Sequence, residues 1–355
     1  MTPRSFLLLA CLLAAGTLAA AQHAPAPAPA APQTPATAAQ ALPQPPFVRA
    51  IQQVRGDLYK VQSGPGVGAV TLFLVTPDGI ILADPLSPEF ASWLKGELAS
   101  RFPGRPVKYV LQSHYHWDHA RGGGVFADTA RVVAHENLPK NLALPLGQAR
   151  PPGDTDDLDR DGRLSRDEAQ TGTRANFDAF DRNRDGYLTA AEINADIQRP
   201  DVTFSDRYTV TLGGKRAVLI HAGNRHTDDL FDVYFPDERV LFAGDYVWVK
   251  RLCCGFGFDR RPLADWIASV RALESLDFDL LVTSHWESGT KADLTGVRRY
   301  LEDLRDAVSA GIAAGRPVDE LQRTVRLPQY QDWAGYDQLP TIVRSAYVSL
   351  RQYSR

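Results

Sequence analysis

The sequence predicts an α+β protein whose two halves each contain strands, then a helix, then a further strand. Strand-like runs in the first half lie at 57–62, 69–76 and 79–83, before an amphipathic helix over 88–102 and a strand over 107–112. Runs in the second half lie at 208–212, 216–221, 230–235 and 239–243, before a helix over 263–276 and a strand ending at His285. This order favours sheets that are covered by helices.

The N-terminal segment is predicted to be removed or extended rather than folded. Residues 1–21 contain Arg4, an apolar run and a small-residue end, which is typical of a secretory signal peptide. A membrane anchor and a lipoprotein site at Cys11 are alternatives, but the apolar run is short for either. Residues 22–46 alternate Ala and Pro, as semi-rigid linkers do. We therefore expect a periplasmic or secreted protein with no membrane span in its mature chain.

Residues 47–355 are long enough for one large domain that carries an insertion. Helical patterns at 292–314 and 340–353 predict a C-terminal helical extension, 291–355, packed on that domain. The formal net charge of −3 argues against a nucleic-acid partner. Beyond the predicted signal peptide, the cysteines are the adjacent pair Cys253-Cys254. A strained disulfide, free thiols and buried apolar packing all remain open for that pair.

The densest cluster of functional groups directly follows the strand over 107–112. There, three imidazoles and a carboxylate occupy six positions, His114, His116, Asp118 and His119. In an extended segment His114 and His116 point the same way, while a turn after Trp117 directs Asp118 and His119 towards a second point. Imidazole and carboxylate are ligands of zinc, and of iron or manganese. The cluster predicts two metal ions in preference to a surface or buried histidine cluster.

Further candidate ligands lie at or just beyond the ends of other predicted strands. They are His226, Asp245 and His285, with His221 as an alternative to His226. Strand ends are where functional groups of layered α/β proteins gather. His135 ends a short apolar run and is expected to be a buried, hydrogen-bonded imidazole instead.

The motif His114-x-His116-x-Asp118-His119, followed by His226, Gly244-Asp245 and Ser284-His285, resembles the metallo-β-lactamase superfamily. The resemblance implies an αββα sandwich formed by residues 47–150 and 200–290. It also implies a first metal held by His114, His116 and His226, a second held by Asp118, His119 and His285, and Asp245 as the bridge. Arg225 stands where the family often has glycine, which is why His221 stays open as the third ligand.

The resemblance further implies two Zn²⁺ ions, with iron or manganese as alternatives, and catalytic roles for Asp118 and Asp245. The expected reaction is hydrolysis of a small ester, thioester or lactone by a hydroxide that bridges the metals. Metallo-β-lactamases commonly have Cys or Ser in place of Asp245, so β-lactam hydrolysis is the second choice. The same fold also carries out redox chemistry on iron. A calcium-dependent binding module with a vestigial metal site is the alternative from another functional class.

The segment between the halves, 151–199, is predicted to bind calcium. From Asp154 to Asp196 it holds twelve acidic residues and six arginines. Two stretches, 157–168 and 181–192, match the EF-hand loop, with glycine at position 6 and Glu at position 12. Because Pro151-Pro152-Gly153 excludes an entering helix, dockerin-like repeats are the nearer resemblance. An acidic insertion without metal is the alternative. The expected Ca²⁺ positions are Asp157, Asp159, Asp161, Arg163, Glu168, Asp181, Asn183, Asp185, Tyr187 and Glu192.

Overall fold

The computed structural model describes the C-terminal nine-tenths of the chain with short gaps. The described residues are 49–64, 68–144, 146, 157, 159, 161–169, 171–252, 258 and 261–353. The predicted signal peptide, the linker and Cys253-Cys254 lie outside them. In the part that is described, no helix has both the length and the apolar character needed to cross a bilayer.

The first sheet contains seven strands in the order β1-β2-β3-β4-β5-β6-β9. Their bounds are β1 Gln52–Arg55, β2 Leu58–Gln62, β3 Val70–Thr76, β4 Gly79–Ala83, β5 Val107–Gln112, β6 Arg131–His135 and β9 Val202–Phe204. Strands β1 to β4 are antiparallel, and β4, β5, β6 and β9 are parallel. A tight hairpin turn at Pro77-Asp78 joins β3 to β4, with Thr76 opposite Gly79.

The second sheet contains six strands in the order β10-β11-β12-β13-β14-β15. Their bounds are β10 Arg207–Leu212, β11 Lys215–Ile220, β12 Asp232–Phe235, β13 Val240–Ala243, β14 Leu280–Thr283 and β15 Gly289–Thr290. The pair β13 and β14 is parallel, and the other pairs are antiparallel. Each sheet therefore contains parallel strands whose carboxyl ends lie at the same edge. The loops that follow these strand ends can bring their side chains together there.

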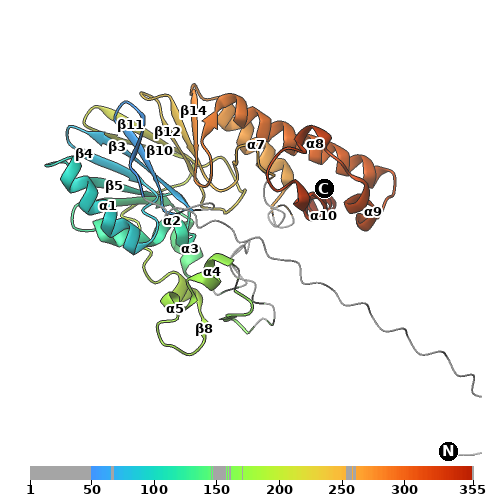
Figure 1. Ribbon diagram of the computed structural model, residues 1–355, viewed down its shortest axis with the longest axis horizontal. Helices are drawn as coiled ribbons and strands as arrows, with labels where there is room; N and C mark the ends of the chain where they lie inside the picture. The colour runs from blue at the N-terminus through green and yellow to red at the C-terminus, as the bar shows by residue number, and fades with distance from the viewer. Residues whose placement is uncertain are drawn as a thin grey trace, which may run out of the picture. The chain divides into compact units, whose positions relative to one another are not determined.

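Alternating side chains divide the interior into three apolar layers. Leu72 and Leu74 of β3 point between the sheets, and so does Phe242 of β13. Phe73 packs under α1 (Pro88–Arg101). On the far side, Leu241 packs under α7 (Leu263–Glu274), α8 (Lys291–Ala313) and α10 (Leu339–Tyr353). Figure 1 shows α1 on one side of the sheets and α7 with α8 on the other. The α+β prediction and its αββα arrangement are confirmed.

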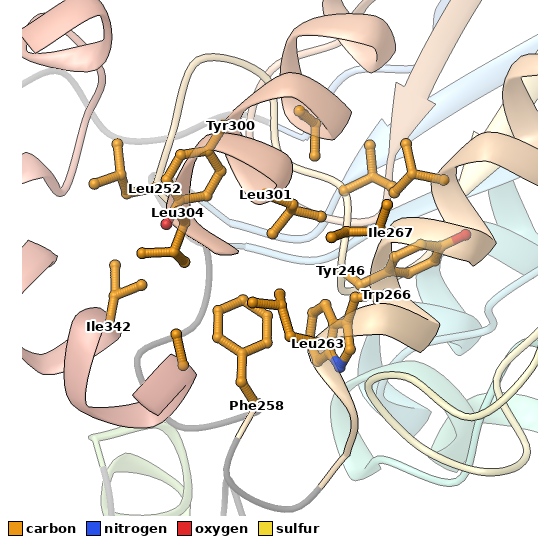
Figure 2. Close-up of a cluster of buried hydrophobic side chains, with 14 of the residues drawn as sticks. Tyr246, Leu252, Phe258, Leu263, Trp266, Ile267, Tyr300, Leu301, Leu304 and Ile342 are labelled. Carbon is orange, nitrogen blue, oxygen red and sulfur yellow. The ribbon is translucent and has the colours of Figure 1, made fainter. Parts of the chain in front are cut away.

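The C-terminal extension packs on the second sheet through a large aromatic and aliphatic cluster. Figure 2 shows Tyr246, Trp266, Tyr300 and Ile342 within this cluster. Tyr330 also lies in this cluster, and its ring centroid is 5.4 Å from that of Tyr300, so it packs in the core. The remaining short helices of the domain are α2 Trp117–Ala120, η1 Arg121–Phe126, α3 Leu138–Leu142, α9 Val318–Thr324, η2 Pro328–Tyr330 and η3 Tyr336–Gln338.

The acidic insertion forms a small unit that contacts Trp117 and Arg121, just after β5. It contains β7 Leu164–Ser165, α4 Thr171–Ala175, α5 Phe177–Phe180, β8 Tyr187–Leu188 and α6 Ala190–Ile193. Leu164 of β7 pairs with Leu188 of β8. Between the two loops the chain forms two short helices, α4 and α5, with a turn at Asn176. The ring centroid of Phe180 is 5.2 Å from that of Trp117, so the insertion contacts α2, the helix that contains Asp118 and His119.

Candidate metal centre

The side chains predicted to bind metal come from five segments that meet at one edge of the sandwich. His114 and His116 follow β5, and Asp118 and His119 lie in α2. The other three, His226, Asp245 and His285, follow β11, β13 and β14 respectively. All seven belong to one of two groups, and within each group the ligand atoms lie within 4.8 Å of one another. The first group contains His114, His116, His226 and Asp245, and the second contains Asp118, His119 and His285.

Asp245 lies between the two groups. Its Oδ2 is 3.8 Å from His114 Nε2 and 3.7 Å from His226 Nε2 in the first group. The same oxygen is 3.3 Å from His119 Nε2 and 3.2 Å from His285 Nε2 in the second. One carboxylate oxygen therefore faces imidazole nitrogens of both groups, which is the arrangement expected of a bridging ligand.

The electrostatics of the site fit a bound cation. Burial holds the pKa of His114 and His226 well below the usual value, so both rings are neutral and each has a lone pair on one nitrogen. Burial would raise the pKa of Asp245, but the His119 and His285 imidazoles outweigh it and hold that pKa well below its usual range. His114 Nε2 is buried with no hydrogen-bond partner among the described residues. A buried, orphaned nitrogen in a set of imidazole and carboxylate donors is suited to Zn²⁺.

Asp84 supports both groups, although the sequence analysis did not identify it. It is fully buried after β4, where it accepts hydrogen bonds from Ser113 N at 2.9 Å and Ser113 Oγ at 2.9 Å. It also lies 3.0 Å from His119 Nδ1, which directs the other ring nitrogen of His119 towards Asp245. Asp84 follows directly on the apolar strand β4, and Asp245 follows one residue after the apolar strand β13. That position is the sequence signal that could have identified Asp84.

The sequence profile of the metallo-beta-lactamase superfamily matches residues 64–285, which is more than half of the chain. The chain belongs to this superfamily. The alpha subunit of 2,4-dinitroanisole O-demethylase from Nocardioides sp. is 27% identical over 241 residues, 66% of this chain and 57% of that protein. A linear primary-alkylsulfatase from Pseudomonas sp. is 25% identical over 281 residues, 73% of this chain and 50% of that protein. The chain thus matches little more than half the length of these relatives.

Two solved structures share the fold of this chain. A metallo-beta-lactamase from Pontibacter korlensis has a TM-score of 0.51 and 19% identity, covering 72% of this chain and 99% of its own. A stereoselective inverting sec-alkylsulfatase from Pseudomonas sp. has a TM-score of 0.61 and 17% identity, covering 86% of this chain and 50% of its own.

Arg225, where the superfamily often has glycine, belongs to a buried network beneath the centre. Its guanidinium pairs with Asp232 at 2.6 Å, and both side chains are fully buried. Asp232 also accepts hydrogen bonds from Tyr246 Oη at 2.8 Å and Gly244 N at 3.0 Å. Because Arg225 precedes His226 and Gly244 precedes Asp245, this network ties together the two loops that carry those side chains.

Among the described residues, His135 and His221 lie outside the two metal groups. Nδ1 of His221 is 2.9 Å from the Leu230 carbonyl oxygen, and its ring lies 4.2 Å from that of His135. His135 is buried, and its Nε2 is 2.7 Å from the Ser205 carbonyl oxygen. Among the described residues, His226 rather than His221 therefore completes the first group. The prediction of a buried, hydrogen-bonded His135 is confirmed.

The insertion places the acidic side chains of its first loop together. Ligand atoms of Asp157, Asp159 and Glu168 lie within 4.8 Å of one another. The glycine at position 6 of each loop has a positive φ of 84°, as a tight turn requires. In the second loop, Asp181 Oδ2 accepts a hydrogen bond from Gly186 N at 3.0 Å. The side chains at position 7 contact each other, with the Arg163 guanidinium 4.2 Å from the Tyr187 ring centroid.

Proposed function

We propose that this protein is a dinuclear metal-dependent hydrolase that acts on an ester, thioester or lactone. The observation that carries the proposal is the position of Asp245, whose Oδ2 faces ring nitrogens of both ligand groups within 3.8 Å. His114, His116 and His226 would hold one ion, and Asp118, His119 and His285 the other. Two zinc ions so held would supply a nucleophilic water at neutral pH and an electrophile for the scissile bond, with iron or manganese as alternatives.

The protein's own groups orient this site and handle protons. Asp84 fixes the His119 ring, and Ser284 Oγ donates to Asp245 Oδ1 at 2.5 Å, which leaves Oδ2 for the centre. Asp118 is the carboxylate of the site that keeps solvent access, with 28% of its side chain exposed against 8% for Asp245. That exposure suits Asp118 to accept and release a proton during turnover.

The nature of Asp245 and the relatives together favour one class of leaving group. Superfamily β-lactamases commonly have Cys or Ser at this position, so Asp245 supports an ester, thioester or lactone. Relatives named as an alkylsulfatase and an O-demethylase also support an oxygen leaving group over a β-lactam nitrogen. A sulfate ester is therefore the second candidate substrate, ahead of a β-lactam.

The test is a substrate screen with metal analysis on the mature protein. Zinc-loaded protein would be assayed with 4-nitrophenyl butyrate, an acyl thioester, a γ-lactone, 4-nitrophenyl sulfate and nitrocefin. We expect two metal ions per chain and metal-dependent turnover of an oxygen ester, thioester or lactone. A single ion per chain, or efficient nitrocefin turnover without esterase activity, would overturn the proposal.

Two further parts of the proposal concern the environment of the enzyme. We propose that the insertion binds Ca²⁺ through its two loops, supported by the gathered carboxylates of the first loop and the paired glycine turns. We also propose export to the periplasm or beyond, supported by the N-terminal pattern of residues 1–21. Cell fractionation with N-terminal sequencing tests export, with cleavage after Ala21 as the expected result.

A further inference from the structure

Arg251 lies beside the metal centre and has no acidic partner among the described residues. The Arg251 guanidinium stacks on the Trp286 ring, 4.3 Å from its centroid. Trp286 directly follows His285, and the two rings are 5.6 Å apart. No ion pair or hydrogen bond of the Arg251 side chain is found among the described residues, although the side chain is only partly exposed. Buried Arg225, by contrast, is neutralised by Asp232.

Two buried N–H donors at this position lack an acceptor. They are Nε of Arg251 and Nε1 of Trp248, both without a hydrogen-bond partner in the described part of the chain. The Trp248 ring lies 4.7 Å from that of Trp286, so the side chains that carry the two donors both lie against the Trp286 ring. Nearly all buried polar groups of folded proteins have partners, and those that do not call for an explanation. Acceptor oxygens from a ligand would satisfy both donors.

The backbone here is held in a strained conformation by the C-terminal extension. Trp286 has a φ of 60° and Lys250 a φ of 48°, a region that bulky residues rarely adopt. Leu252 N donates to Ala334 O at 2.9 Å, and Ala334 N donates to Lys250 O at 3.0 Å. Such strain persists where surrounding contacts enforce it, and it is concentrated at functional sites.

We propose that Arg251, Trp248 and Trp286 form an anion-binding subsite next to the second ligand group. The guanidinium and the two indoles would bind an oxyanion of the substrate, a carboxylate or a sulfate, with the indoles contacting its apolar part. This inference rests on the proposed hydrolase function and adds a substrate class to it, namely anionic esters. Arg251 is then a specificity residue, while the metal groups carry out the chemistry.

A kinetic comparison of charged and neutral substrates tests the subsite. Zinc-loaded wild type, Arg251→Met and Arg251→Lys would be assayed with 4-nitrophenyl acetate, 4-nitrophenyl hemisuccinate and 4-nitrophenyl sulfate. In Arg251→Met we expect KM for an anionic substrate to rise by about 10-fold to 100-fold, the range for a lost charged hydrogen bond. KM for the acetate should stay unchanged, and Arg251→Lys should recover part of the loss. Arg344→Met, on the exposed face of α10, controls for the loss of one positive charge.

The pattern across the two anionic substrates identifies the source of the anion. An effect on the hemisuccinate means that the subsite binds a remote carboxylate, and an effect on the sulfate alone means that it binds the scissile group. Equal changes for neutral and anionic substrates, or no change for any, would refute the subsite. Thermal melting of Arg251→Met must match wild type for either conclusion.

A binding experiment keeps the subsite testable if none of these esters is hydrolysed, an outcome that would count against the proposed function alone. Calorimetric titration of zinc-loaded protein with benzenesulfonate and with benzyl alcohol needs no turnover. The subsite predicts that benzenesulfonate binds wild type and Arg344→Met equally and binds Arg251→Met more weakly. Equal affinity for wild type and Arg251→Met, at equal zinc content, would overturn the assignment.

Discussion

The metal centre and the acidic loops of the insertion differ in how their side chains are brought together. The centre gathers residues from His114 to His285, out of five segments and both sheets, and most of these side chains are buried. The acidic loops use consecutive positions, 157–168 and 181–192, that are mostly exposed. The centre is thus preorganised by the fold, since strands and buried hydrogen bonds hold each side chain before an ion arrives. The loops concentrate like charges that the fold alone does not offset.

The largest expected effect comes from removing the residue that joins the two ligand groups. Asp245→Ala should lower kcat/KM by more than about 100-fold. Losing a residue that only orients a metal ligand costs up to about 100-fold, and Asp245 itself faces both groups. The protein should bind fewer than two zinc ions yet keep its far-UV circular dichroism spectrum. Asp206→Ala, which removes an exposed carboxylate, serves as the control. Full activity of Asp245→Ala would show that the two groups do not work as one centre.

The next effect tests whether the centre depends on the buried network beneath it. Arg225→Ala leaves the Asp232 carboxylate buried without its partner, which should lower the free energy of unfolding by about 3–5 kcal/mol. Urea unfolding measures this change. Zinc affinity should fall about 10-fold to 100-fold, because the His226 and Asp245 loops lose their connection.

The double variant Arg225→Met with Asp232→Asn is the matched control for that network. The asparagine oxygen still accepts from Gly244 N, and no charge is left buried. We expect it to recover most of the unfolding free energy but not the zinc affinity. Recovery of both would mean that the network stabilises the fold without positioning the ligands.

A smaller effect concerns acid stability at His221, just outside the centre. Burial and the nearby His135 lower the pKa of His221 from 6.5 to about 4. The unfolded chain therefore binds this proton below pH 6.5, and the folded chain does not until about pH 4. The contribution of the neutral His221 ring to the free energy of unfolding is therefore complete above pH 6.5 and is lost as the pH falls from 6.5 towards 4. This contribution is about 2 kcal/mol, after a reduction for the partial solvent exposure of the ring.

His221→Asn keeps a donor for the Leu230 carbonyl but cannot titrate. Its unfolding free energy should fall less than that of wild type between pH 6.5 and 4. Both proteins should be measured free of metal, so that loss of zinc does not contribute. Parallel pH curves would assign the acid sensitivity to other groups.

The smallest expected effect is that of calcium on the insertion. A site with a dissociation constant of about 10⁻⁴ M, within the extracellular range, adds about 1.4 kcal/mol of stability at a tenfold excess of calcium. Selective calcium removal should therefore lower the melting temperature and change the substrate KM while zinc stays bound. The double variant Glu168→Gln with Glu192→Gln should behave like the calcium-free protein. If it melts and turns over like the parent, the loops do not order the insertion through calcium.

The same contrast explains what the sequence could predict. His114, His116, Asp118 and His119 were recognisable because four functional groups in six positions form an unusual local pattern. Asp84 was missed because it stands alone after an apolar strand, and only the distant His119 reveals its role. Arg225 was noted as a departure from the family, but its partner Asp232 lies inside strand β12, where no local signal marks a buried charge.

Short and polar elements were the other limit of sequence prediction. Most strand and helix positions were confirmed to within two residues because apolar periodicity defines them. Strands β1 and β9 were not predicted, since Gln52–Arg55 is polar and largely exposed and Val202–Phe204 has only three residues. Both are edge strands, and pairing with a neighbour determines them more than their own composition does.

The position of β9 has a consequence for how the protein reaches its native state. Among the described strands β9 pairs with β6 alone, and the segment that separates the two, residues 136–201, contains the whole insertion. Joining the two strands must close that segment, and the entropic cost of closure grows with its flexible length by about 0.6 kcal/mol per doubling. An insertion that becomes compact early shortens the flexible length. Its ordering therefore affects the rate at which the edge strand docks more than the stability of the finished sheet.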